Sequence, residues 1–123
     1  MTFDALFAVV TTASGGRFAH RDHVYLTWLA IGEVGASAAV DLVSAGIQET
    51  ARYAGQPRKY HATMSRAWVE LIAARMPAEP EPFDAFVARH PEVLDKRLLN
   101  TLYRPGTLAT EAARTGWVPP DRQ

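Results

Sequence analysis

Apolar residues recur with helical spacing along most of the chain, and no run alternates apolar and polar residues for long enough to predict a strand. Near the N-terminus, one helical face is marked by positions three and four apart (Phe3, Leu6, Phe7 and Val10). Thr2 is a natural N-cap for this helix, and the sequence SGG at 14–16 ends it. The chain therefore begins with a short one-faced helix.

Three longer helices are predicted in the middle of the chain. Residues of about 21–34 are apolar nearly all round, which is typical of a central, buried helix. Residues 36–54 are amphipathic, with Asp41 and Gln48 opposite the apolar face, and Gly55 and Pro57 end the helix. The next helix covers about 60–76.

The C-terminal part is predicted to be a set of short helices. The proline-rich stretch 77–82 is an extended connector rather than a domain boundary, and helices of about 83–90 and 92–103 follow it. Thr107 is the expected cap of a last short helix that ends at Gly116, before a tail at 117–123. The pattern predicts an all-α fold, a single compact domain over 1–123 with about six to seven helices.

Composition narrows the class of partner. The chain has 123 residues, no cysteine, and 13 basic against 13 acidic residues without a long run of either sign. A balanced charge argues against nucleic acid or an anionic membrane as the main partner. The first apolar run carries Asp4 and no preceding basic residue, so we expect no signal peptide. No apolar stretch is expected to reach the ~18–20 residues of a membrane span, and a cytoplasmic protein is predicted.

Three of the four histidines stand at the starts of predicted apolar helices, in FAHRDHVYLTW (18–28) and KYHATMSRAW (59–68). His20 and His23 are three residues apart and so share a helix face, and His61 lies on the same face as Met64 and Trp68. If the two helix starts are adjacent in space, the three rings share one pocket.

The chemistry of such a pocket leaves alternatives open. A helix N-terminus and burial both disfavour imidazolium, so neutral rings are expected, suited to taking a proton or to holding a metal. The three histidines are thus candidate catalytic residues and, alternatively, metal ligands. The spacing H-x-x-H is common, the stronger motif H-E-x-x-H is missing, and ordinary packing histidines remain a third interpretation. No cofactor is expected unless the metal alternative holds.

A second group of residues completes the candidate site. Glu33 lies on the apolar side of its helix, where an isolated buried carboxylate would suit a general acid or base, unless it reaches solvent. Trp28, Tyr60 and Trp68 are candidate walls of an aromatic pocket, although each is also a plausible core residue. Thr27 and Lys59 complete the candidate substrate-binding set.

Three stretches resemble a widespread group of small, mostly hypothetical bacterial proteins: FAHRDHVYLTWLAIGEVG, GIQETARYAGQPRKYHATMSRAWVELIA and LYRPGTLATEAARTGWVPPD. The residues that fall on the pattern of that group are His20, His23, Tyr60, His61, Thr63, Trp68, Tyr103, Leu108, Ala113, Arg114, Trp117, Pro120 and Asp121. Ala62 departs from it, because the group usually has an acidic residue there. In size the chain is also similar to small stand-alone Pictet–Spengler enzymes of antibiotic pathways, which implies condensation chemistry on an aromatic amine.

The leading hypothesis is therefore a small cofactor-free enzyme of specialised metabolism, with histidine acid/base catalysis on an aromatic small molecule. A three-histidine metal-binding protein is the first alternative. A non-catalytic ligand-binding or interaction domain is the second, possible as a homodimer if Leu108 and Trp117 cover a dimer face. Walker, Rossmann and G-x-S-x-G motifs are missing from the sequence, which disfavours nucleotide-driven chemistry and serine hydrolysis.

Overall fold

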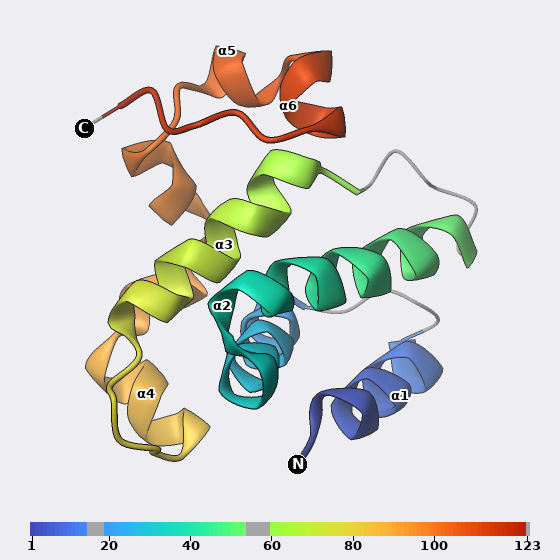
Figure 1. Cartoon of the computed structure of the whole chain (residues 1–123), viewed down its shortest axis with the longest axis vertical. Helices are drawn as coiled ribbons and strands as arrows, with labels where there is room; N and C mark the ends of the chain where they lie inside the picture. Colours follow the sequence, from blue (N-terminus) through green and yellow to red (C-terminus); the bar gives the residue numbers. More distant parts are fainter. Residues whose placement is uncertain (15–18, 54–59, 123) are drawn as a thin grey trace.

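A computed structural model describes residues 1–14, 19–53 and 60–122 of the chain, and this part is helical, with no strand. Figure 1 shows the arrangement, in which the long α2 passes between α1 and α3 and the shorter elements gather at the two ends of α3. The elements are α1 (Phe3–Ser14), α2 (His20–Tyr53), α3 (Ala62–Arg75), α4 (Phe83–Arg89), the 3₁₀ helices η2 (Pro91–Leu94) and η3 (Lys96–Thr101), α5 (Pro105–Leu108) and α6 (Glu111–Thr115). The predicted all-α single domain is confirmed.

The two middle helices predicted at 21–34 and 36–54 are the two halves of α2, which is bent at Gly35. This glycine has φ 83° and ψ 163°, a backbone conformation outside the helical region. Residues with a Cβ rarely adopt a positive φ, so a glycine is needed where α2 changes direction. The predicted stop signals Gly55 and Pro57 lie outside the described residues.

The first half of α2 is the centre of the core, as its apolar composition predicts. One buried cluster joins α2 to α3, α4 and the 3₁₀ helices through residues such as Val24, Trp68 and Phe86. A second cluster joins α2 to α1 through Leu6 and Leu29. Aromatic and aliphatic side chains of α2 that touch both clusters make the core continuous (Tyr25, Trp28 and Ile31).

Two local predictions in the C-terminal part are wrong. The helix expected at 92–103 is split into η2 and η3, because Asp95 turns the chain and its carboxylate accepts the Arg97 N–H at 2.9 Å. The last helix is capped by Thr110, whose hydroxyl accepts the Ala113 N–H at 3.1 Å. Thr107, the expected cap, instead donates its hydroxyl hydrogen bond to Asp121.

The C-terminal tail is fastened to α3 and η3 by a set of contacts that we call the C-terminal clasp (Thr63, Tyr103, Thr107, Gly116, Val118 and Asp121). The buried Thr63 hydroxyl donates to the Gly116 carbonyl at 2.6 Å and accepts the Val118 N–H at 3.0 Å. The Tyr103 hydroxyl donates to the Val118 carbonyl at 2.7 Å. Leu108 and Trp117 consequently pack against the core of their own chain.

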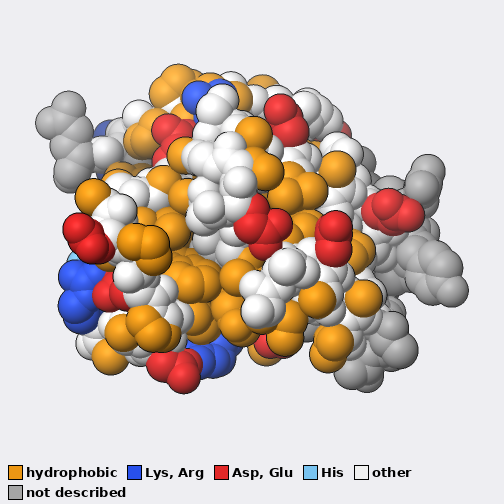
Figure 2. All heavy atoms as spheres, turned by 60° about the horizontal axis from the view of Figure 1, so that its bottom comes forward, with side chains coloured by type: hydrophobic (Ala, Val, Ile, Leu, Met, Phe, Trp, Pro, Cys, Tyr) orange, Lys and Arg blue, Asp and Glu red, His pale blue; other side chains and the backbone are white. Residues whose placement is uncertain are grey.

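Hydrophobic side chains also reach the surface. Figure 2 shows them gathered on the lower part of the face seen from the bottom of Figure 1, with acidic side chains beside them. Within the described residues, His20–Thr50 is by length and composition apolar enough to span a membrane, contrary to the expectation that no stretch is long enough. The core helix of a soluble protein meets the same criterion, so the absence of a membrane partner stays a prediction.

Candidate functional site

His20 begins α2 and is held by contacts to two other elements. Its Nε2 lies 2.9 Å from the Val93 carbonyl oxygen of η2. Because a carbonyl can only accept, Nε2 carries the proton of this hydrogen bond. The ring also meets Trp68 of α3 edge-on, with ring centroids 4.6 Å apart. Burial lowers the pKa of His20 below its ordinary value of 6.5.

His23, one turn further along α2, carries a buried nitrogen with no partner. Its ring centroid lies 6.3 Å from that of His20. Nε2 is buried and makes no hydrogen bond within the described part of the chain. Burial, helped by the nearby His20, lowers the pKa of His23 to about 4, so the ring is neutral near pH 7. The expectation of a neutral imidazole at this helix start is therefore supported.

His61, unlike His20 and His23, is the N-cap of α3. Its Nδ1 accepts the Met64 N–H at 3.1 Å, and its Nε2 lies 2.7 Å from the Leu108 carbonyl oxygen. The first contact requires a bare Nδ1 and the second a proton on Nε2, so both nitrogens are used by the fold. His61 also precedes Trp68 by seven residues, about 10 Å along the helix axis.

The three histidines therefore do not share one pocket. His20 contacts Trp68 and lies beside His23, and the His61 side chain joins α5 to the start of α3. Among the residues that the structure describes, no group of three or more His, Asp or Glu side chains is arranged to hold a metal ion. The condition under which the three rings would share one pocket is therefore not met in the described structure, and the metal alternative stays a prediction.

The other candidate residues fall into the core, onto the surface, or outside the described residues. Trp28 is half-buried against Phe83, with centroids 5.5 Å apart, and Thr27 is buried, its hydroxyl donating to the His23 carbonyl at 2.8 Å. Glu33 is exposed, and its carboxylate accepts the Phe3 N–H at 2.7 Å, which caps α1. Of the two alternatives left open by the sequence for Glu33, the structure therefore shows the solvent-exposed one and not the isolated buried carboxylate. Lys59 lies outside the described residues.

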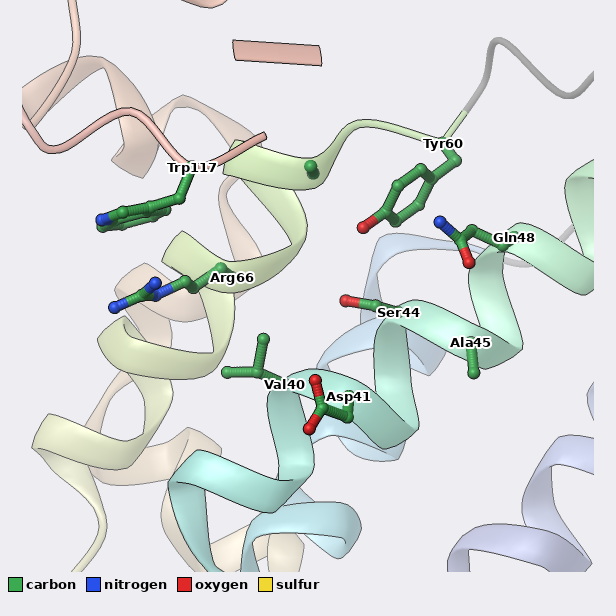
Figure 3. A pocket seen from close by; sticks show the side chains of 9 residues that line it. Val40, Asp41, Ser44, Ala45, Gln48, Tyr60, Arg66 and Trp117 are labelled. Atoms are coloured by element: carbon green, nitrogen blue, oxygen red, sulfur yellow. The ribbon is translucent and has the colours of Figure 1, made fainter. Parts of the chain in front are cut away.

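A groove with a volume of about 400 Å³ opens between the second half of α2 and the start of α3. Figure 3 shows its two walls, one formed by α2 and the other by the start of α3 with Tyr60 before it and Trp117 from the tail after α6. Its lining residues are Val40, Asp41, Ser44, Ala45, Gln48, Tyr60, Ala62, Arg66 and Trp117. Tyr60 is thus the predicted substrate-binding residue that the structure places in a groove, and the described lining includes no histidine.

The α2 wall carries a polar row. Asp41, Ser44 and Gln48 are spaced three and four residues apart, which brings them onto one face of the helix. Ser44 Oγ lies 3.2 Å from the hydroxyl oxygen of the buried Ser65, which fixes it at the bottom of the groove. Figure 3 shows the Tyr60 ring directed toward this row, beside Gln48.

The opposite end of the groove is closed by a stacked pair. The Arg66 guanidinium lies over the Trp117 ring, 4.1 Å from its centroid. Arg66 Nε also donates to Glu70 at 3.1 Å, so its charge is compensated within α3, as the four-residue spacing predicts. Figure 3 shows the Trp117 ring edge-on, with the Arg66 side chain lying along its face at this end of the groove.

Most of this groove is not predicted by the sequence. Asp41 and Gln48 lie opposite the apolar face of their helix, as predicted, but a solvent-exposed face and a groove wall have the same hydropathy pattern. The available signal was the polar row itself, with Ser44 inside an otherwise apolar stretch. Trp117 was missed because its position depends on the C-terminal clasp.

No protein-family model, no curated protein and no solved structure matches the chain. The resemblance to small bacterial proteins and to Pictet–Spengler enzymes therefore stays a prediction.

Proposed function

We propose that the protein binds an aromatic small molecule in the groove between α2 and α3. The observation that supports this proposal is the combination of a 400 Å³ groove, two aromatic side chains on one wall and a polar row on the other. Ligand sites commonly have volumes of ~300–1,000 Å³ and combine apolar walls with a few polar groups that orient the ligand. This composition matches the aromatic ligand expected from the sequence.

Each wall has a distinct contribution to binding. Tyr60 and Trp117 offer ring faces to an aromatic group, for which offset or edge-on contacts contribute roughly 0.5–1.5 kcal/mol beyond burial. Ser44 and Gln48 offer a hydroxyl and an amide, which hydrogen-bond to polar substituents. The Arg66–Trp117 stack and the Ser44–Ser65 contact hold these groups in place before the ligand arrives, which lowers the entropic cost of binding.

Histidine acid/base catalysis, including a Pictet–Spengler-type condensation in a cofactor-free enzyme of specialised metabolism, is a second candidate function. The observation that favours it is the neutral, unpartnered Nε2 of His23. Two features make it the weaker proposal. A base with a pKa near 4 accepts protons poorly at neutral pH. The groove is lined by other residues, so the ligand and the histidine pair would need to meet elsewhere.

Binding is tested by titrating the isotopically labelled protein with 2-phenylethanol, phenethylamine and 3-phenylpropionate, which share one ring and differ in their polar group. We expect at least one of them to shift the backbone resonances of 41–48 and 60–66 and the Trp117 indole resonance. Tyr60→Ala should weaken that binding several-fold, because it removes a ring face from the groove. Met64→Ala is the matched control, since Met64 is an exposed α3 residue away from the lining.

The same sample distinguishes the two candidate functions. If none of the three compounds shifts groove resonances at millimolar concentration, the binding proposal is wrong. Tryptamine with acetaldehyde then reports on catalysis. A rate of ring closure above the uncatalysed rate that His23→Ala abolishes would favour the histidine site, and an unaffected rate would exclude it.

A further inference from the structure

We infer that the ligand of the groove is a cation, an aromatic ring joined by a short chain to a protonated amine, and that Asp41 binds the ammonium group. This inference rests on the proposed function and adds the charge of the ligand and the residue that recognises it. It follows from the charges of the groove, from the positions of its aromatic side chains and from the spacing along α2.

The groove has one uncompensated charge among its described lining residues. Asp41 and Arg66 are the two ionisable side chains there that are charged at neutral pH. Arg66 is paired with Glu70 at 3.1 Å and covered on one side by Trp117. Asp41 is exposed and has no hydrogen bond or ion pair within the described residues. The groove therefore presents an unpaired carboxylate, while the guanidinium among those lining residues already has a carboxylate partner.

The remaining groups of the groove also suit a cation. Tyr60 and Trp117 present ring faces, and an organic cation over such a face is attracted by the negative charge density of the ring. Ser44 and Gln48 supply oxygen acceptors for ammonium hydrogens. An anion, by contrast, would approach Asp41 with no free cationic partner among the described lining residues.

The spacing along α2 sets the shape of the ligand. Asp41 and Gln48 are seven residues apart, about 10 Å along the helix axis. Figure 3 shows Tyr60 beside Gln48 at one end of the polar row and Asp41 at the other end. A ring against Tyr60 and an ammonium at Asp41 therefore require a linker of a few bonds between them. Phenethylamine is a probe with this arrangement.

The size of the expected preference follows from the exposure of Asp41. An exposed ion pair is weak because water screens the charges, and partial desolvation within a groove strengthens it. We expect phenethylamine to bind about three- to tenfold more tightly than 2-phenylethanol, which has the same ring and chain without the charge. 3-Phenylpropionate should bind more weakly than either. Added salt should reduce the preference for the amine.

The test is a titration of the whole chain with phenethylamine and 2-phenylethanol, repeated with Asp41→Asn. The variant should lower the affinity for the amine to that for the alcohol and leave the alcohol unaffected. Glu49→Gln is the matched control, because it removes an exposed carboxylate from the same helix outside the groove lining. Circular dichroism checks that both variants remain folded.

The results of this titration distinguish the inference about charge from the proposed function on which it rests. Equal affinity for the amine and the alcohol, tighter binding of the carboxylate, or a preference for the amine that survives Asp41→Asn would overturn the inference while the groove remained a binding site. Binding of none of the three compounds would overturn both. A preference for the amine that is lost in Asp41→Asn and kept in Glu49→Gln supports both.

Discussion

The protonation state of His23 is a consequence of where α2 places its ring. The buried imidazole has a pKa of about 4, against an ordinary value of 6.5, so the unfolded chain binds a proton at mildly acidic pH that the folded chain does not. The free energy of unfolding therefore has its full value above pH 6.5 and falls as the pH drops toward 4. The loss from this one group is about 3 kcal/mol. Urea denaturation at a series of pH values measures it.

Replacing His23 with leucine isolates that contribution. His23→Leu removes both the titrating ring and the unpartnered Nε2, so its stability should depend less steeply on pH in this window, with a smaller slope left from His20. Carboxylates with lowered pKa values, such as Glu92 and Asp121, lose their contributions at lower pH, below ordinary values of 4.5 and 3.8. A slope unchanged by His23→Leu would show that the ring is not buried as described.

At the scale of elements, the bend of α2 depends on Gly35. An alanine there would have to hold φ at 83° and ψ at 163°, a region occupied almost only by glycine that costs other residues roughly 1–3 kcal/mol, so Gly35→Ala should lower the free energy of unfolding by about that amount. Gly32→Ala is the matched control, since Gly32 lies in the same helix with open space around its Cα. That change should raise stability by about 0.5–1 kcal/mol. Equal effects of the two substitutions in thermal melts would contradict the assigned role of Gly35.

The elements whose signals are local could be predicted from the sequence. Thr2 caps α1 as expected, because its hydroxyl accepts the Ala5 N–H at 3.1 Å. Residues 21–34 are apolar on nearly all sides, and the helix that they form lies in the core, as this pattern predicts. The wrong predictions concern side chains that have more than one possible hydrogen-bond partner. Thr107 and Thr110 carry equivalent cap signals, and Asp121, fourteen residues beyond Thr107, decides between them.

The site could be predicted only in part, for the same reason. The sequence predicts both His61 and Tyr60 as site residues, and the structure gives the two side chains different roles. His61 is occupied by Met64 and Leu108, whereas Tyr60 faces the groove. A helix wheel shows which face a histidine is on, but not that a carbonyl 47 residues later accepts a hydrogen bond from its Nε2–H. Whether His61 meets His20 and His23 depends on how the two helix starts are placed relative to each other, which the sequence alone does not determine.

At the scale of the whole molecule, the groove belongs to three separate segments, namely α2, the start of α3 and the tail after α6 (Figures 1 and 3). The tail lies at the groove because the hydrogen bonds of the C-terminal clasp hold it beside the start of α3. Three residues of the clasp, Thr63, Tyr103 and Asp121, are also among the positions of the predicted resemblance to small bacterial proteins. If that prediction holds, the pattern of the group includes residues that hold the tail. The possible homodimer stays a prediction, which light scattering addresses.

The clasp couples the stability of the tail to binding, and Thr63 is the residue that tests the coupling. Thr63→Val keeps the shape of the side chain but leaves the Gly116 carbonyl and the Val118 N–H without their partner, which should cost about 1–3 kcal/mol. The Val118 amide should then exchange its hydrogen faster, and the loosened Trp117 wall should weaken ligand binding. Thr115→Val is the control, because that hydroxyl bonds only to Glu111 within α6. Unchanged exchange at Val118 together with unchanged binding would mean that Trp117 is held in place without the clasp. Binding lost without faster exchange would mean that Thr63 affects the groove by another route than the loosening of the tail.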